Sequence, residues 1–230
     1  MPFQPVESQR LYERVAHQIG DLIRAGEFAP GDRLPAERDL AKTLGVSRPV
    51  VREAMIALEV TGLVEVRTGS GAYVRGKPPA PGAPLDAGAS PSDILNARIL
   101  IEGEIAALAA TNAREPDLAA VAEALDEMIR AQAQARSWAG ADLAFHAAVA
   151  AATGNGALIG VVQRLWQEQY GPMFALLSQR VNLAENWPAT LAGHRAILKG
   201  LRSRSAAAAR RAMHAHLAQV LEVMTSDAEG

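Results

Sequence analysis

The spacing of apolar residues along the first 75 positions predicts three helices followed by a two-stranded hairpin. Over residues 8–25, 36–44 and 47–62, apolar residues recur at intervals of three and four, as on one face of an α-helix. Leu11, Val15, Leu22 and Ile23 form the expected buried side of the first helix, and Ser8 precedes it as a possible cap. A glycine follows each of the first two runs, and glycine readily adopts the left-handed conformation that ends many helices.

The segment between the second and third helices is a short turn, and a hairpin follows the third. Ser47 is a good N-cap, because its hydroxyl can accept a backbone N–H that the next helix leaves unpaired. Two β-prone runs, 63–66 and 72–74, flank the turn sequence Thr68-Gly69-Ser70-Gly71. Helix, turn, helix and hairpin in this order indicate a winged helix-turn-helix.

Three arginines lie on the two central helices of this pattern. Arg48 and Arg52 are four residues apart at the start of the third helix, so both project from one face. The N-terminal turns of such a recognition helix read base edges, and the arginine fork matches O6 and N7 of guanine. Arg38, on the preceding helix, can reach the same groove or the phosphate beside it. The alternative, three surface arginines without a ligand, fits the complete helix-turn-helix and wing less well.

A stretch rich in proline, glycine and alanine separates this head from the rest of the chain. Residues 76–92, GKPPAPGAPLDAGASPS, show no periodic apolar face and predict a semi-stiff linker. Beyond it the period is helical throughout, which predicts an antiparallel helical bundle. The expected helices span 93–112, 116–136, 138–153, 156–179, 185–202 and 204–225, with a break at Asn182 and a kink at Pro172 inside the fourth. The sequence therefore predicts a mainly α protein with a winged head at 1–75, a linker at 76–92 and a helical domain at 93–226.

Composition narrows the function classes. Hydrophobic residues make up 49% of the chain and charged residues 21%, which is typical of a folded protein with a buried core. The net charge of −2 excludes a generally basic coat, so DNA affinity has to come from a local cluster of arginines and two copies per site. The absence of cysteine excludes disulfides and thiolate metal sites. No apolar run approaches the about 18–20 residues that span a bilayer, and no signal peptide is visible, so we expect a cytoplasmic protein.

Two polar residues fall on apolar stripes of the predicted bundle. Arg98 lies within the apolar stripe formed by Ile94, Ile101, Ile105 and Leu108, and a guanidinium facing a core needs an anion. Either an internal salt bridge or the carboxylate of a bound small acid would supply that anion. Gln169 lies on the apolar face of its helix, where it can bind a hydroxyl of a small ligand or, as we favour, bond a neighbouring helix.

Histidines and one aspartate also face inward. Asp142 and His146 are four residues apart on one helix face, and His194 shares a face with leucines. On the last helix the period does not choose between His214 and His216, which lie on opposite sides of the apolar stripe. Three imidazoles and one carboxylate are a good ligand set for Zn²⁺, Ni²⁺ or Mn²⁺, whereas a lone inward histidine is usually a satisfied core group.

The head resembles the DNA-binding domain of GntR-family bacterial repressors. The matching run, residues 34–74, is LPAERDLAKTLGVSRPVVREAMIALEVTGLVEVRTGSGAYV. In that family three arginines and the wing tip contact operator DNA, and the resemblance places these roles on Arg38, Arg48, Arg52 and Gly69. A further position that often contacts DNA in relatives is Pro49 here, which has no side-chain donor.

Residues 92–226 resemble the helical ligand-binding domain of the FadR subfamily within that family. The segments ARILIEGEIAALAA, DLAFHAAVAAATGN, HRAIL and ARRAMHAHL carry the likeness. It implies a divalent metal, zinc by expectation, and a carboxylate effector bound to that metal in a cavity that Arg98 also faces. The implied metal ligands are Asp142, His146, His194 and His216, which leaves His214 outside. The long-chain acyl-CoA sensor that names the subfamily lacks this full set, which argues against acyl-CoA as the ligand.

The two resemblances imply a homodimeric transcriptional repressor that binds a palindromic operator in double-stranded DNA and senses a small organic acid. The overall likeness is to the branch that senses hexuronates and related sugar acids. Lactate or another 2-hydroxy acid is the alternative effector, and a constitutive DNA-binding protein with a purely structural metal is an alternative function. A metal-dependent hydrolase is another alternative function, but four protein ligands leave little room for a substrate and no nucleophile motif is visible. We therefore expect a protein without enzymatic activity.

Overall fold

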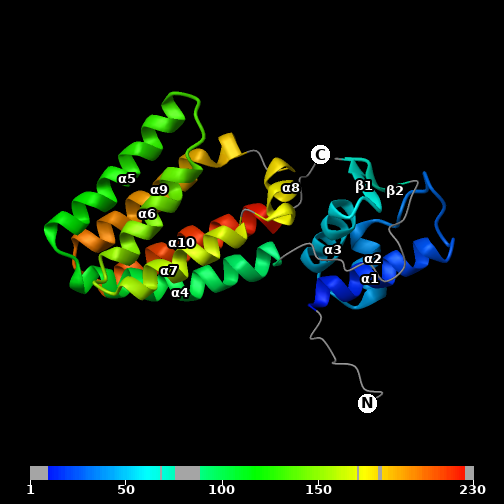
Figure 1. Ribbon diagram of the computed structural model, residues 1–230, viewed down its shortest axis with the longest axis horizontal. Helices are drawn as coiled ribbons and strands as arrows, with labels where there is room; N and C mark the ends of the chain where they lie inside the picture. The colour runs from blue at the N-terminus through cyan, green and yellow to red at the C-terminus, as the bar shows by residue number, and fades with distance from the viewer. Residues whose placement is uncertain (1–9, 68, 76–88, 170, 181–182, 226–230) are drawn as a thin grey trace, which may run out of the picture. The chain divides into compact units, whose positions relative to one another are not determined.

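The computed structural model describes residues 10–67, 69–75, 89–169, 171–180 and 183–225 (Figure 1). They form two compact units, one containing α1–α3, β1, β2 and α8, and the other containing α4–α7, α9 and α10. The predicted fold class, a winged helix-turn-helix followed by an all-helical bundle, is confirmed. The cap at Ser8, most of the predicted linker (76–88) and the predicted break at Asn182 lie outside the described residues.

The N-terminal unit has the elements that the apolar pattern predicts. They are α1 (Leu11–Arg24), α2 (Glu37–Leu44), α3 (Arg48–Val60), β1 (Val64–Arg67) and β2 (Gly71–Val74). The two strands are antiparallel, with Val64 opposite Val74 and Arg67 opposite Gly71. The main-chain N–H of Val66 donates to Glu59 Oε1 over 3.1 Å, which ties the wing to α3.

The turn between α2 and α3 has one expected feature and one unexpected one. Gly45 ends α2 with φ = 67°, the left-handed conformation expected of a glycine cap. Ser47 holds the N-cap position of α3 in an extended conformation, but its side chain makes no capping hydrogen bond. The prediction that its hydroxyl caps α3 is therefore wrong. Pro49 in the first turn needs no backbone donor there, and its fixed φ suits a helix start.

The core of this unit lies between α1, α3 and the wing. On α3 the apolar stripe is buried as predicted, with Val51, Ala54 and Leu58 fully covered. On α1 the stripe is rotated relative to the prediction. Leu11 and Leu22 are 49% and 41% exposed. The buried residues follow a more regular helical spacing that begins one position later, and they are Tyr12, Val15, Ala16, Ile19 and Ile23.

The C-terminal unit is an antiparallel helical bundle. Its helices are α4 (Pro91–Asn112), α5 (Glu115–Ala133), α6 (Ala139–Ala151), α7 (Gly156–Gln169), α9 (Leu183–Arg202) and α10 (Ala206–Thr225). The helix predicted over 156–179 is in fact two helices, because α7 ends at Gln169 and α8 (Pro172–Arg180) begins three residues later. Pro172 therefore starts a helix instead of kinking one, since a proline ring is tolerated in the first turn but not in a helix interior.

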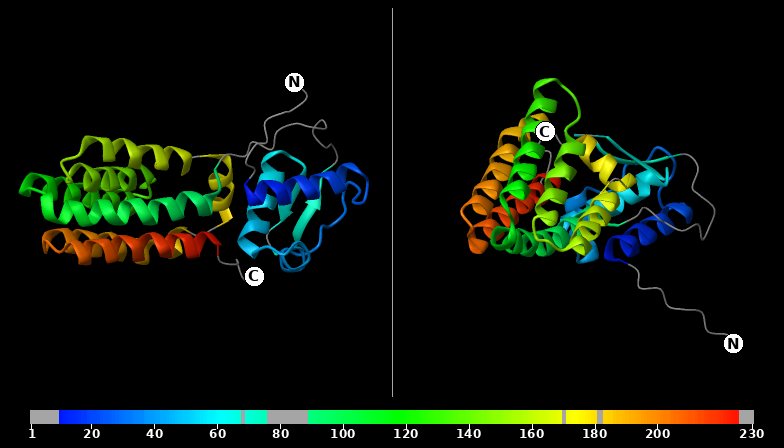
Figure 2. Two further views of the ribbon diagram at one scale, coloured as in Figure 1. Left: turned by 90° about the horizontal axis from the view of Figure 1, so that it is seen from below. Right: turned by 60° about the vertical axis from the view of Figure 1, so that its left-hand side comes forward.

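Close helix packing positions the polar groups of the bundle. α10 lies along α4 and α9, and α6 lies between α5 and α7 (Figures 1 and 2). Glycines allow this approach: a Cβ added to Gly200 would lie 2.8 Å from the Cα of Ala209. Among the described helices, none combines the length and the apolar character needed to cross a bilayer.

Candidate metal centre and DNA-binding surface

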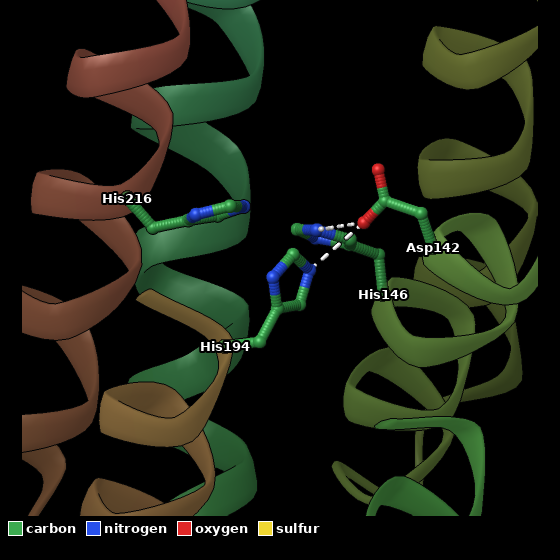
Figure 3. Close-up of side chains that lie close together, drawn as sticks. All are labelled: Asp142, His146, His194 and His216. Atoms are coloured by element: carbon green, nitrogen blue, oxygen red, sulfur yellow. Dashed lines mark hydrogen bonds and ion pairs between the residues drawn. The ribbon is translucent and has the colours of Figure 1, made fainter. Parts of the chain in front are cut away.

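Four side chains from three helices converge in the middle of the bundle. Asp142 and His146 come from α6, His194 from α9 and His216 from α10, and they point toward one another (Figure 3). One potential ligand atom from each lies within 4.8 Å of all the others. The three histidines are at most 3% exposed. The structure thus brings together all four residues that the sequence suggested as a ligand set, and it places His216, not His214, in the cluster.

His194 has one nitrogen engaged and one directed into the cluster. Its Nδ1 lies 2.8 Å from the carbonyl oxygen of Thr190, which can only accept, so Nδ1 carries the proton and donates. In the neutral ring Nε2 is then an acceptor, and it lies 2.8 Å from Asp142 Oδ1, another acceptor. Two lone pairs at this distance repel unless a cation or an additional proton lies beside them. This pair belongs to a group of four side chains that could hold a metal ion.

In His146, as in His194, one ring nitrogen contacts a neighbouring residue and the other is directed into the cluster. Its Nδ1 contacts Glu102 Oε2, while Nε2 lies 3.6 Å from Asp142 Oδ1 and has no hydrogen-bond partner among the described residues. Burial alone would lower the pKa of His146, but the negative charge of Glu102 and the nearby carboxylate of Asp142 outweigh it, and the pKa is raised. In the neutral ring, with Nδ1–H donating to Glu102, Nε2 presents a lone pair to the centre.

The other two residues are in the protonation states that metal ligands need. Burial and the neighbouring His194 and His146 hold the pKa of His216 well below its usual value, so His216 stays neutral. Burial would raise the pKa of Asp142, but the neighbouring His146 and His194 hold it well below its usual value, so Asp142 is ionised. Neutral imidazoles and a carboxylate are the forms that bind divalent transition metals.

The approach of His216 to the cluster depends on a glycine of α9. A Cβ added to Gly193 would lie 2.6 Å from His216 Nδ1 and 3.1 Å from its Cβ and Cγ. The imidazoles of His194 and His216 have ring centroids 4.3 Å apart. Only glycine at this position leaves room for the His216 ring where it lies.

A second group of polar residues is buried beside the histidines. Arg98 on α4 is 2% exposed, and its Nε donates to Glu102 Oε1 over 2.6 Å. Its Nη1 donates to Gln169 Oε1 over 2.5 Å, and its guanidinium carbon lies 4.2 Å from the ring centre of Trp166. Nη2 has no partner among the described residues. The internal salt bridge considered for Arg98 is therefore present, Gln169 bonds a neighbouring helix, and one guanidinium nitrogen remains available.

The sequence reasoning missed Glu102. This residue is 1% exposed and lies between Arg98 and His146. Burial would raise its pKa, but the charges of Arg98 and His146 together with their hydrogen bonds lower it to about 2, so it is an anion. Its signal was present in the sequence: Glu102 follows Arg98 by four residues, the spacing at which opposite charges meet on a helix.

On the N-terminal unit the predicted DNA-contacting residues differ in exposure. The Arg38 side chain is 81% exposed and lies 3.6 Å from Asp39, and Arg48 is exposed in the first turn of α3. Arg52 is only 13% exposed and its Nη2 lies 3.2 Å from Glu37 on α2, so part of its charge holds the two helices together. Gly69 is exposed in the wing turn with φ = 71°.

The wing carries two exposed arginines that the sequence reasoning did not single out. The Arg67 guanidinium lies 4.5 Å from the ring centre of Tyr73, whose hydroxyl is 2.8 Å from Ser70 Oγ. Arg33 packs so closely over Gly71 that an added Cβ there would lie 2.9 Å from its Nε. Arg33 and Arg67 therefore place two guanidinium groups at the wing, and that of Arg67 also pairs with Glu65 over 3.3 Å.

A winged helix-turn-helix in one chain with a helical domain around a buried polar centre defines a ligand-responsive transcriptional regulator. Residues 11–74 match the family model described as bacterial regulatory proteins, gntR family, and residues 93–219 match the FCD domain model. The chain belongs to the gntR family of bacterial regulatory proteins, and its C-terminal part is an effector-binding FCD domain.

Relatives agree with this assignment over nearly the whole chain. The Uxu operon transcriptional regulator of Escherichia coli K12 is 38% identical over 221 residues, which cover 93% of this chain and 86% of the relative. The Exu regulon transcriptional regulator of the same strain is 39% identical over 221 residues, covering 92% and 83%. The solved structure of E. coli McbR/YncC has a TM-score of 0.53 at 22% identity, covering 94% of this chain and 97% of that one, and shows the shared fold. Both the Uxu and the Exu relative are transcriptional regulators.

Proposed function

We propose that this protein is a homodimeric repressor that releases its operator when a sugar acid binds a metal in the FCD domain. The observation that carries the proposal is the 2.8 Å approach of His194 Nε2 to Asp142 Oδ1, with Nδ1 of the same ring donating to Thr190. That arrangement favours a cation beside the two atoms. Likeness to the Uxu and Exu regulators supports a sugar acid over other carboxylates.

The metal ligands in this proposal are Asp142, His146, His194 and His216. Their three nitrogens and one carboxylate oxygen suit Zn²⁺ best, with Ni²⁺ and Mn²⁺ as alternatives. The bound metal would act as a Lewis acid that attracts the carboxylate of the effector. The surrounding residues orient two of the ligands, because Thr190 and Glu102 accept the Nδ1 protons of His194 and His146, so that in the neutral rings Nε2 faces the centre.

Arg98 and Gln169 are the effector-binding residues in this proposal. Arg98 Nη2 is buried without a partner in the described part of the chain, and an unpaired guanidinium N–H in a core favours an anionic oxygen. The Oε1 of Gln169 already accepts from Arg98, which leaves its amide N–H groups for a hydroxyl of the effector. A sugar acid offers both a carboxylate and hydroxyls.

The DNA contacts in this proposal come from Arg38, Arg48, Arg52 and Gly69. Arg48 and Arg38 are exposed on α3 and α2, where arginine reads guanine or binds phosphate. Because the net charge of the chain is −2, one head alone would bind weakly, so we propose two copies on a palindromic operator in the bacterial cytoplasm. Leu100 and Leu108, 69% and 40% exposed on one side of α4, are an apolar surface for the second copy.

Effector binding can regulate DNA affinity only if it favours one arrangement of the heads over another. The link that we propose for this coupling includes Ser90, whose hydroxyl donates to Glu53 Oε1 of α3 over 2.8 Å. Both residues are buried, and Ser90 directly precedes α4, the helix that carries Arg98. A movement of α4 on effector binding would thus act on the end of the chain that is anchored to the recognition helix.

A thermal-shift screen of the full chain tests this function. Glucuronate, galacturonate and lactate are added with and without a chelator, and operator release is followed in parallel. We expect a hexuronate to raise the melting temperature and release DNA, and we expect chelation to abolish both effects. Arg98→Ala should keep operator binding but lose the response. No shift from any acid, or a shift that survives chelation, would contradict the proposal, whereas a response to lactate alone would change the effector class.

A further inference from the structure

Glu102 occupies a position that neither the metal ligands nor the effector-binding residues explain. It lies on α4, is 1% exposed, and uses its two carboxylate oxygens on two different partners. Oε1 accepts from Arg98 Nε over 2.6 Å, and Oε2 contacts His146 Nδ1 on α6. One buried carboxylate thus connects the arginine that faces the effector with a histidine of the metal cluster.

We infer that Glu102 is a positioning residue that orients the metal ligand His146 and the effector-binding Arg98 at the same time. This inference rests on the function proposed above. Glu102 itself contacts neither the metal nor the effector in this scheme. It acts through its two partners.

The effect on His146 is a choice of tautomer. A carboxylate can only accept, so the neutral ring of His146 carries its proton on Nδ1 and keeps its lone pair on Nε2. Nε2 is the nitrogen without a partner in the described residues and the one directed at Asp142. Without Glu102 the ring would be free to rotate or to protonate Nε2, and either change removes a metal ligand.

The effect on Arg98 is a fixed guanidinium plane. Glu102 holds Nε and Gln169 holds Nη1, so two of the three nitrogens are anchored and only Nη2 remains for an effector oxygen. The Trp166 ring lies against the same guanidinium and limits its rotation. The direction of the remaining donor is therefore set by Glu102 and Gln169 together.

Glutamine cannot replace Glu102 in both roles, although it has nearly the same shape. Its amide has one accepting oxygen and one donating nitrogen, whereas both partners of Glu102 donate. The charged guanidinium attracts the oxygen more strongly than the imidazole does. The amide nitrogen then faces His146 Nδ1 and forces the proton onto Nε2, the atom needed for the metal.

The test compares Glu102→Gln with Glu104→Gln in the full-length protein. Glu104 lies two residues away on α4, is 60% exposed and pairs with Arg210 over 2.6 Å, so the control removes the same charge outside the site. Zinc affinity is measured by competition with a chelator, and histidine tautomers in the metal-free protein are read by ¹⁵N NMR. We expect Glu102→Gln to lose about 10- to 100-fold in zinc affinity and to lose the Nδ1–H form of His146, while Glu104→Gln retains both.

A double variant separates positioning from simple destabilisation. In Arg98→Met/Glu102→Gln no guanidinium competes for the amide oxygen, so the oxygen can turn to His146 and restore its tautomer. We expect this variant to bind zinc more tightly than Glu102→Gln alone, and it also keeps the test decisive should the single variant not fold. Equal zinc affinity in wild type and Glu102→Gln, or no recovery in the double variant, would overturn the inference. A wild type that binds no zinc would instead refute the proposed function, and the tautomer measurement would still judge Glu102.

Discussion

Replacing Gly193 by alanine would place a methyl group against the imidazole of His216. The added Cβ would lie 2.6 Å from Nδ1 and 3.1 Å from Cβ and Cγ of His216. Non-bonded heavy atoms prefer a separation of about 3.5–4.0 Å, so the ring or the two helix backbones must move apart by about 1 Å. Because His216 belongs to the metal cluster, this displacement acts on both folding and metal binding.

The expected magnitude follows from two opposing terms. Overpacking of this kind destabilises a core by about 1–3 kcal/mol, and alanine in place of glycine in a helix recovers about 1 kcal/mol. If the helices keep their spacing, the strain is relieved by moving the imidazole instead. A loss of about 1.4 kcal/mol in metal binding then corresponds to a tenfold weaker zinc affinity. We therefore expect a net loss of up to about 2 kcal/mol in folding stability, or a tenfold weaker zinc affinity if the ring moves instead.

The assay is urea denaturation of the metal-free protein combined with zinc titration against a chelator. Gly160→Ala is the matched control, because Gly160 lies in the helix α7 and an added Cβ there meets nothing within 4 Å. The control should be stabilised by about 0.5–1 kcal/mol and bind zinc as the wild type does. If Gly193→Ala behaves like this control in both measurements, the placement of His216 against α9 is wrong.

Three further predictions address the other parts of the proposal. Arg48→Ala should weaken specific operator binding by about 1–3 kcal/mol without changing the melting temperature, because a bidentate base contact is lost; an unchanged gel shift would reject this role. The combined change His146→Ala and His194→Ala should leave purified protein without metal, and full occupancy by elemental analysis would rule out the ligand set. Leu100→Lys should shift sedimentation equilibrium toward monomer, since it places a charge on the exposed apolar side of α4, and an unchanged dimer mass would place the interface elsewhere.

Much of the local structure could be predicted from the sequence. The helix-turn-helix and wing follow from short-range signals, such as the 3.6-residue period of α3 and the left-handed glycine that ends α2. The same period directed Asp142 and His146 to one face of α6, because a spacing of four residues is a property of the helix itself. Where local signals competed, prediction failed: the buried stripe of α1 runs through Tyr12 and Ile19, not through Leu11 and Leu22.

Only the tertiary structure decided which polar groups meet. The helical period left His214 and His216 equivalent, and the packing of α10 separates them. The bundle places His216 beside His194, whereas His214 lies against α4 at Gly103. The period likewise showed that Arg98 faces inward, but it did not show that Glu102 would connect Arg98 to His146, which lies 44 residues after Glu102. The reason is that periodicity fixes the direction of a side chain about its own helix axis, whereas its partners depend on which helix packs against that face and at what height.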